Sequence, residues 1–297
     1  MSYTEETALF ACAGEVLVGI LAKPEIPAEI GVVVIVGGPQ YRAGSHRQFV
    51  LLSRALAQAS FAVLRFDYRG MGDSEGQQRD FLAVSEDVGM AIGALQDHIP
   101  SVKKIALWGL CDGASAALIY CQEIRDPRVV GLCLLNPWVR SDASLALTQV
   151  KHYYTQRLRE KEFWAKLLSG KVASSAVSGL VKSVRTALTP QNHSKKATEN
   201  LSFQQKMASA WKRLDGKILL LLSGKDYTAK EFLEHATTSP QWSAQLTQHN
   251  LSRYDMPSAD HTFSDLLSRE LVEKLTITWL AGIHGNDEVQ TMGTLLN

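Results

Sequence analysis

The sequence predicts an α/β protein with a doubly wound, mostly parallel sheet and a helical cap insertion. Short apolar runs rich in β-branched residues alternate with amphipathic stretches, a rhythm typical of a parallel sheet that helices cover on both faces. The rhythm stops within residues 138–213, which are rich in Lys, Arg, Ser and aromatic residues, and then resumes. We therefore expect a core formed by residues 1–137 and 214–297, with residues 138–213 as the cap.

Each expected strand is a short apolar run bounded by turn residues, in a chain of 297 residues that is long enough for a sizeable core. The strands are expected at 31–38, 61–70, 103–110, 129–138, 216–226 and 245–255. The helices are expected at 46–60, 81–99, 114–124, 229–238 and 263–283, the first because Phe49, Leu52 and Leu56 recur at helical spacing. Ligands of open parallel sheets bind at the carboxyl ends of the strands, so the residues after the strands are the candidates for a site.

Charge and hydropathy exclude several classes of protein. Lys and Arg number 31 against 30 Asp and Glu, for a net charge of +1, so nothing favours non-specific binding of nucleic acid. The longest apolar runs fall far short of the roughly 20 residues that a membrane span needs. The N-terminal segment has no basic region ahead of an apolar run, unlike a secretory signal. We therefore expect a cytoplasmic protein with no membrane span and reduced thiols.

The cysteines show neither a disulfide framework nor a metal site. The four cysteines lie far apart in the sequence, and no CxxC or Cys/His cluster is present. The phosphate-binding patterns GxGxxG and GxxxxGK[ST] are absent as well. We therefore expect no metal and no cofactor. Cys12, Cys121 and Cys133 are expected to serve only in packing, which is the usual role of a free cysteine.

The remaining cysteine lies in the sharpest motif of the chain, Gly109-Leu110-Cys111-Asp112-Gly113. This segment follows an apolar strand, opens a helix and matches G-x-S-x-G with Cys in place of Ser. The central residue of such an elbow occupies a strained turn, and side chains at the two glycine positions would collide with neighbouring backbone. The helix N-terminus favours the thiolate, which is the nucleophilic form. Cys111 is the expected nucleophile, with a buried structural cysteine as the alternative.

A thiol nucleophile needs a histidine base, which in turn needs a carboxylate to orient it. His261 is the expected base because it lies in the loop between the last strand and the last helix. Asp226, at the end of the strand after the insertion, is the expected acid, with Asp255 and Asp260 as rivals. His46, His98, His235 and His284 lie in or beside expected helices and are expected at the surface or at helix ends. His152 and His193 lie in the insertion, where they could at most contact substrate.

Two backbone N–H groups are expected to form an oxyanion hole. One belongs to Asp112, directly after the nucleophile, and the other to the loop that follows the first apolar strand. Gly38 is the first choice in that loop and Gln40 the second, because Pro39 has no N–H. Gln40 and Trp138 are candidates for substrate contact. Aromatic residues of the insertion are expected mainly to form the core of the cap: Tyr153, Tyr154, Phe163 and Trp164.

The order of the motifs GGP, FDYRGMGDSEG, G-x-C-x-G, SGKD and DH resembles the α/β-hydrolase superfamily over most of the chain. GGPQYRAGSHRQFVLLSRAL, LRFDYRGMGDSEG and GLCDGASAAL resemble more narrowly the exosortase A system-associated hydrolases, which bacteria encode with exopolysaccharide and protein-sorting machinery. The cysteine elbow is also similar to that of dienelactone hydrolases. Val36 stands where many hydrolases have a histidine before the oxyanion loop. The FDYRGMGDSEG loop is expected to be a turn held by hydrogen bonds of Asp67, Arg69 and Asp73, with no chemical role.

The sequence thus predicts a hydrolase that cleaves an ester or thioester of a small molecule through Cys111, His261 and Asp226. An acyltransferase would use the same acyl-enzyme. Two other classes stay open: a non-catalytic hydrolase-fold protein that binds a ligand or partner, and a redox-sensing thiol. The acyl group and the oligomeric state, for which a homodimer is one option, are not determined by the sequence.

Overall fold

The computed structural model describes residues 2–38, 40–140 and 201–294, with side chains described as far as Ile283. The chain divides into two compact units. The first comprises Met1–Val139 and Leu201–Asn297, and the second comprises Arg140–Asn200. The first unit contains the sheet, the helices around it and all the site residues discussed below.

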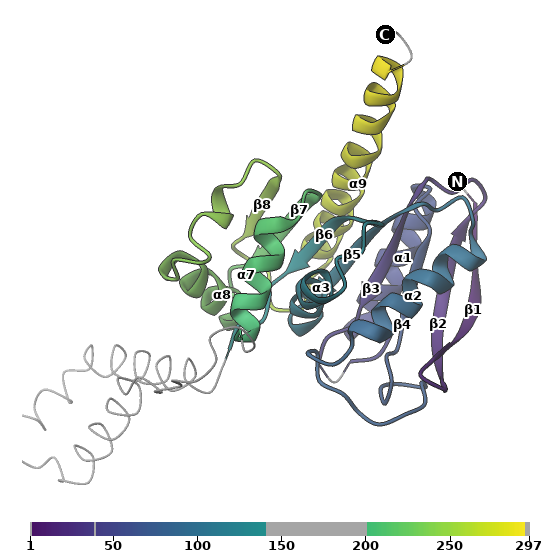
Figure 1. Ribbon diagram of the computed structural model, residues 1–297, viewed down its shortest axis with the longest axis horizontal. Coiled ribbons are helices and arrows are strands. Elements are labelled where there is room, and N and C mark those ends of the chain that lie inside the picture. The colour runs from purple at the N-terminus through teal and green to yellow at the C-terminus, as the bar shows by residue number, and fades with distance from the viewer. Residues whose placement is uncertain (1, 39, 141–200, 295–297) are drawn as a thin grey trace, which may run out of the picture. The chain divides into compact units, whose positions relative to one another are not determined.

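An 8-stranded sheet in the order β1-β2-β4-β3-β5-β6-β7-β8 forms the centre of this unit (Figure 1). All neighbouring strands from β4 to β8 along this order pair in parallel. This arrangement is the doubly wound, mostly parallel sheet that the apolar runs predict. The strand bounds are β1 Tyr3–Cys12, β2 Glu15–Pro24, β3 Ile30–Ile35, β4 Val63–Phe66, β5 Lys104–Leu110, β6 Val129–Leu135, β7 Lys217–Ser223 and β8 Leu251–Met256.

The antiparallel hairpin β1–β2 at one edge of the sheet was not among the predicted strands. Cys12 pairs with Glu15 across a two-residue turn in which Ala13 and Gly14 have φ values of 51° and 86°, as a tight hairpin turn requires. Along β2 the more buried positions alternate with more exposed ones. The exposed positions are also apolar, so the period of two that marks a half-buried strand is hidden in the sequence.

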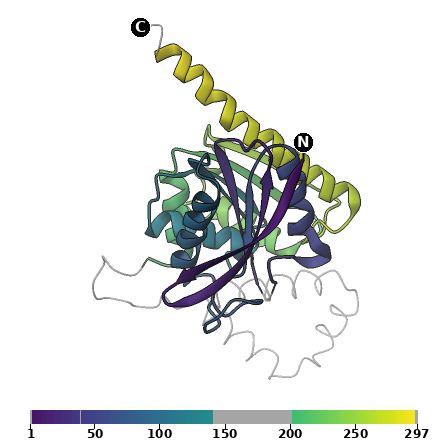
Figure 2. The same cartoon turned by 90° about the vertical axis from the view of Figure 1, so that its right-hand side faces the viewer.

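Helices cover both faces of the sheet, as Figures 1 and 2 show. Along β3, Val33 and Ile35 join one buried apolar cluster whereas Val32 and Val34 join the other, because successive side chains of a strand point to opposite faces. The first cluster includes residues of α2 (Ser85–His98), α3 (Asp112–Glu123), α7 (Phe203–Arg213) and α8 (Tyr227–Thr238). The second includes residues of α1 (Gln48–Gln58) and α9 (Leu266–Thr294).

Helix α7 belongs to the core unit, which corrects the predicted end of the insertion at residue 213. Trp211 is fully buried, and its ring lies 5.6 Å from that of Trp242 and 6.3 Å from that of Phe232. Ser202 and Gln205 form a capping box at the start of the helix. The sequence assigned this helix to the insertion because no apolar strand lies between the insertion and the helix. In the structure the apolar face of the helix packs on the core. Residues 141–200 lie outside the described residues, so their helical structure and their role as a cap remain predictions.

Two further predicted bounds differ from the structure. The expected strand 245–255 begins only at Leu251, because Gln245–Thr247 form a short 3₁₀ helix. A second short 3₁₀ helix, Ser45–Arg47, precedes α1. The last helix continues to Thr294, past the expected end at 283. Within the described residues, none of these helices is long and apolar enough to cross a membrane.

We predict that Gly113→Ala destabilises the fold and that Gly93→Ala does not. A Cβ at Gly113 would lie 2.4 Å from the carbonyl oxygen of Ile35, whereas a Cβ at Gly93, within α2, meets nothing within 4 Å. Overpacking at Gly113 is expected to lower the unfolding free energy by about 1–3 kcal/mol. Gly93→Ala is expected to raise it by about 0.5–1 kcal/mol. Urea unfolding of both variants measures the difference, and equal stabilities would contradict the close approach.

Candidate active site

The predicted site residues converge at one edge of the sheet. Gly38, Cys111, Asp226 and His261 each lie shortly after the last residue of a parallel strand, namely β3, β5, β7 and β8. Because these strands are neighbours or nearly so in the sheet order, their carboxyl ends bring segments from distant parts of the chain to the same edge.

Cys111 occupies the strained turn between β5 and α3. Its backbone has φ 59° and ψ −125°, a conformation that L-residues rarely adopt and that is common at functional sites. A Cβ at Gly109 would lie 2.5 Å from the carbonyl carbon of Gly113, so both glycines are required by the close packing of this turn. Cys111 is the residue directly before α3, so its thiol lies at the positive end of the helix dipole.

The three other cysteines are buried or half-buried free thiols with raised pKa values. Burial raises the pKa of Cys12 to about 11 and that of Cys121 to about 12. Burial also raises the pKa of Cys133, which is 1% exposed. Such thiols are poor nucleophiles at neutral pH. Cys111 alone among the four lies in the elbow and contacts a histidine.

His261 and Asp226 form a direct hydrogen bond. The ring atom Nδ1 of His261 lies 2.8 Å from Oδ2 of Asp226. Asp226 also caps α8, since its carboxylate oxygens accept hydrogen bonds from the backbone N–H groups of Thr228 and Ala229, both at 3.1 Å. The same carboxylate therefore begins the helix and orients the imidazole, and these fixed donors hold it in place.

Hydrogen bonds to Asp226 and Cys111, together with the charges of these residues, raise the pKa of His261 to about 10 against the opposing effect of burial. Burial alone would raise the pKa of Asp226, but the hydrogen bond from His261 and the two backbone N–H groups outweigh it, so the pKa is lowered. The imidazole therefore carries its proton at neutral pH beside a charged carboxylate.

The rival carboxylates are engaged elsewhere. Asp255 is an exposed side chain that pairs with Arg253 at 3.0 Å. Asp260 accepts hydrogen bonds from the backbone N–H groups of Thr262 and Ser264, at 3.2 and 2.9 Å, and so shapes the loop around His261 without reaching the imidazole. The structure brings together Cys111, His261 and Asp226 from the predicted set.

The loop after β3 approaches the elbow closely. Gly38 has φ 59°, and a Cβ at Gly37 would lie 2.2 Å from Oδ1 of Asp112 and 2.5 Å from the carbonyl oxygen of Leu110. Burial raises the pKa of Asp112, while nearby backbone N–H groups, that of Gly38 among them, act in the opposite direction. The two residues expected to supply the oxyanion hole, Gly38 and Asp112, are thus side by side. Pro39 lies outside the described residues.

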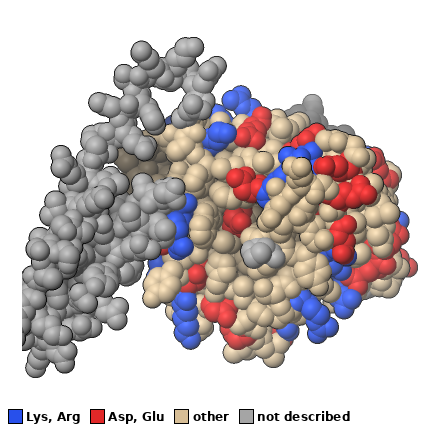
Figure 3. Space-filling model, turned by 90° about the horizontal axis from the view of Figure 1, so that it is seen from below, with Lys and Arg blue, Asp and Glu red and all other residues tan. Residues whose placement is uncertain are grey.

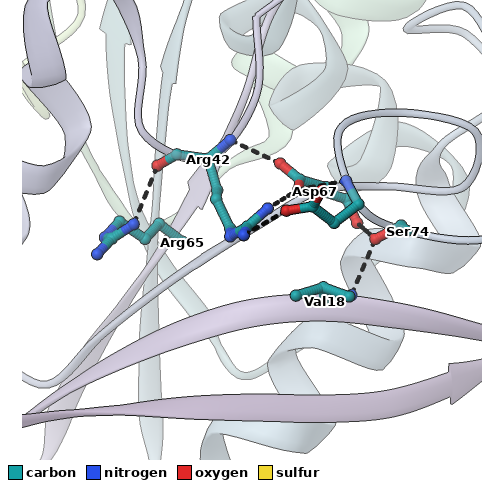
Figure 4. Close-up of polar contacts among 6 residues, drawn as sticks. Val18, Arg42, Arg65, Asp67 and Ser74 are labelled. Carbon is teal, nitrogen blue, oxygen red and sulfur yellow. Dashed lines mark hydrogen bonds and ion pairs between the residues drawn. The ribbon is translucent and has the colours of Figure 1, made fainter.

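An ion pair between the half-buried Arg42 and the buried Asp67 holds the continuation of this loop. The carboxylate of Asp67 accepts a hydrogen bond of 2.6 Å from the backbone N–H of Arg42 and pairs with the Arg42 guanidinium (Figure 4). The backbone N–H of Asp73 donates to the same carboxylate at 3.1 Å, and the Ser74 hydroxyl donates to the Asp67 carbonyl oxygen at 2.5 Å. The FDYRGMGDSEG turn thus anchors the loop that carries Gly38.

Of the two candidate substrate contacts, Trp138 is bonded to the backbone of Cys111, whereas Gln40 is bonded to α1. Trp138 is half-buried, and its backbone N–H donates to the Cys111 carbonyl oxygen at 3.2 Å. Gln40 accepts a hydrogen bond of 3.2 Å from the side-chain amide of Gln48. Neither bond involves a substrate, so their roles remain predictions. The candidate aromatic residues of the insertion lie outside the described residues, as do His152 and His193.

A cavity of about 750 Å³ lies at the opposite edge of the sheet. Its lining includes Lys104, Val129 and Lys217, which are the first residues of β5, β6 and β7. The cavity is therefore separate from the carboxyl ends that carry Cys111. On the face shown in Figure 3, acidic and basic side chains are interspersed over the described surface, in keeping with a net charge of +1.

Two polar contacts at the site were missed by the sequence analysis. Asn136, directly after β6, donates a hydrogen bond to the His261 carbonyl oxygen at 3.1 Å. His46 meets the Thr262 hydroxyl at 2.9 Å and so links the segment before α1 to the loop of His261. The sequence did offer a signal for Asn136, because it is a polar residue between a buried apolar strand and Pro137. It offered no signal for His46, because its partner Thr262 is far away in the sequence.

The chain is an α/β-hydrolase: residues 28–229 match the family described as serine aminopeptidase, S33, and the chain belongs to this family. The match includes the loop of Gly38, the elbow and Asp226, and it ends before His261. This chain has Cys111 where the G-x-S-x-G elbow has serine.

Solved structures of low sequence identity have the same fold. An esterase of Pyrococcus furiosus, Pf2001, superposes with a TM-score of 0.63 at 15% identity, over 95% of this chain and 94% of the other. The α/β hydrolase GrgF of a Penicillium species gives 0.62 at 16% identity, covering 95% and 99%. A dienelactone hydrolase of Anabaena variabilis gives 0.61 at 15% identity, covering 95% and 99%. No curated protein matches the sequence. The predicted α/β-hydrolase fold is confirmed.

We predict that Asp226→Asn lowers the pKa of His261 from about 10 toward its usual value of about 6.5. The amide retains the shape but removes the negative charge that favours the imidazolium. NMR titration of labelled histidines measures the shift, and Asp255→Asn is the matched control that leaves the titration unchanged. An unaltered His261 titration in Asp226→Asn would contradict the assigned contact.

The same pKa shift predicts how stability depends on pH. A pKa raised in the folded state contributes stability that is full below about 6.5 and is lost as the pH rises through about 10. The unfolding free energy of the wild type is therefore expected to fall between these pH values more steeply than that of Asp226→Asn. Denaturant unfolding across this range measures both slopes.

Proposed function

We propose that this protein is an esterase or thioesterase that uses Cys111 as nucleophile, His261 as base and acid, and Asp226 as the orienting carboxylate. One observation carries the proposal: the Asp226 carboxylate is hydrogen-bonded to the His261 ring, and Cys111, at the strained elbow, is near enough to the same ring to help raise its pKa. This is the arrangement that nucleophilic acyl transfer requires. Family membership supports hydrolysis, and esterases are among the proteins of similar fold.

The geometry supports the following sequence of steps. His261 holds the proton of the Cys111 thiol, and the sulfur attacks the substrate carbonyl carbon. The backbone N–H groups of Gly38 and Asp112 stabilise the oxyanion, each by roughly 3 kcal/mol as in comparable sites. His261 then returns its proton to the departing oxygen or sulfur, and the carbon forms a thioester with Cys111. Water, activated by His261, cleaves the thioester and releases the acid.

We also propose, from the sequence resemblance alone, that the substrate belongs to a bacterial exopolysaccharide or exosortase system. GGPQYRAGSHRQFVLLSRAL and GLCDGASAAL support this assignment because they surround the oxyanion loop and the nucleophile. The expected substrate is a small acylated molecule. The near-neutral charge of the chain, +1, favours neither a nucleic acid nor a strongly charged partner.

We predict that wild-type protein offered activated acyl esters and thioesters shows turnover and a mass increase equal to one acyl group. Cys111→Ala is expected to abolish the adduct and lower the rate by on the order of 10³-fold or more, and His261→Gln to lower it similarly. Cys121→Ser, which alters a thiol far from the elbow, is the matched control and is expected to retain full activity. Turnover that survives both active-site substitutions would overturn the proposal. So would an acyl adduct on another residue.

A further inference from the structure

The segment between β6 and the insertion places one buried amide at the centre of the site. Asn136 is 0% exposed and has φ 44°, in the left-handed region that asparagine tolerates better than most residues. This backbone conformation turns the chain away from the sheet directly after β6. Its own backbone N–H donates to the Leu221 carbonyl oxygen of β7 at 3.1 Å, so the residue is bound to the neighbouring strand.

The side chain of Asn136 joins both loops that carry the charged residues of the site. Its amide nitrogen donates to the Ser223 hydroxyl at 2.7 Å and to the His261 carbonyl oxygen at 3.1 Å. Its amide oxygen accepts from the backbone N–H of Ser223 at 2.9 Å. Ser223 ends β7, three positions before Asp226 in the chain. One side chain thus makes hydrogen bonds to the acid segment and to the base residue itself.

The two loops also bind each other through their backbones. The N–H of Gly224 donates to the Met256 carbonyl oxygen at 2.9 Å, and that of Lys225 donates to Ala259 at 3.0 Å. The last of these backbone bonds is at Ala259, two residues before His261. The following bond, to the His261 carbonyl oxygen, comes from the side chain of Asn136. Asn136 follows β6, which is the neighbour of the strand β5 that leads to Cys111.

We propose that Asn136 is a positioning residue for the reaction: its amide N–H₂ fixes the backbone of His261 so that the imidazole stays between Asp226 and Cys111. The expected effect on catalysis rests on the proposed function. A buried amide with two accepting partners has little freedom to move, and small displacements of a base reduce the rate strongly. Asn136 does not touch the reacting atoms.

Two substitutions test the proposal. Asn136→Gly keeps the left-handed backbone and removes all side-chain bonds. Asn136→Asp keeps the acceptor for the Ser223 N–H but replaces the donating N–H₂ with a carboxylate oxygen. Both are expected to lower kcat/KM by tenfold or more, with most of the loss in kcat. Asn136→Gly is also expected to shift the NMR titration of His261 to lower pH, whereas the added negative charge of Asn136→Asp opposes that shift. Ser223→Ala removes one partner of the amide and leaves the bond to His261, so its effect is expected to stay within about threefold.

Asn250 provides the matched control. It is 7% exposed and its amide donates to two carbonyl oxygens, those of Leu214 at 3.0 Å and Gly216 at 2.8 Å. It lies beside the amino ends of β7 and β8, far along the strands from the site. Asn250→Ala is expected to lower the melting temperature by an amount comparable to Asn136→Gly and to leave kcat/KM within twofold of wild type.

The outcomes separate this proposal from the proposed function. The His261 titration needs no turnover, so a shift to lower pH in the uncharged variant Asn136→Gly supports positioning even if the wild type hydrolyses no ester. An unchanged titration with unchanged kcat/KM in both variants overturns it. An equal loss of activity in Asn250→Ala, or failure of both Asn136 variants to fold, also overturns it, because each outcome assigns Asn136 a general structural role.

Discussion

The close approach of three backbone segments around Cys111 is the constraint on which the site depends. Cys111 has a positive φ in a turn that two glycines flank. A Cβ at Gly109 would collide with the backbone of Gly113, and a Cβ at Gly113 would collide with the carbonyl oxygen of Ile35. That contact binds the start of α3 to the end of β3. The loop of Gly38 is therefore beside Cys111 as a direct result of the way the elbow packs.

The rest of the site is built by a second set of contacts, on the other side of Cys111 in the sheet. Asp226 serves as helix cap and as partner of His261, so the start of α8 and the orientation of the base share one carboxylate. The hydrogen bond from His261 and the two backbone donors keep it charged despite its burial, and this charge keeps the proton on His261. Asp226 and His261 are thus coupled to the stability of the fold around them.

Much of this arrangement is visible in the sequence. The elbow glycines, the apolar strands and the polar residues after them predicted Cys111, His261, Asp226 and the mostly parallel sheet, because each depends on local spacing or on which strand end a residue follows. Strand β2 was missed because apolar residues occupy both faces of its central part, VLVGILA. Helix α7 was assigned to the insertion because its packing partners Phe232 and Trp242 come later in the chain.

The sequence by itself determined the position of the elbow and of Cys111 within it, since the steric demands of a strand-to-helix turn act over five adjacent residues. Only the tertiary structure decided which carboxylate meets His261 and placed the Asn136 amide against the His261 backbone. Asp255, Asp260 and Asp226 are all near the end of a strand or in the loop of His261, and spacing alone does not rank their distances to one ring. Those distances follow from the order of β6, β7 and β8 in the sheet, which brings residues separated by 125 positions within 3.1 Å.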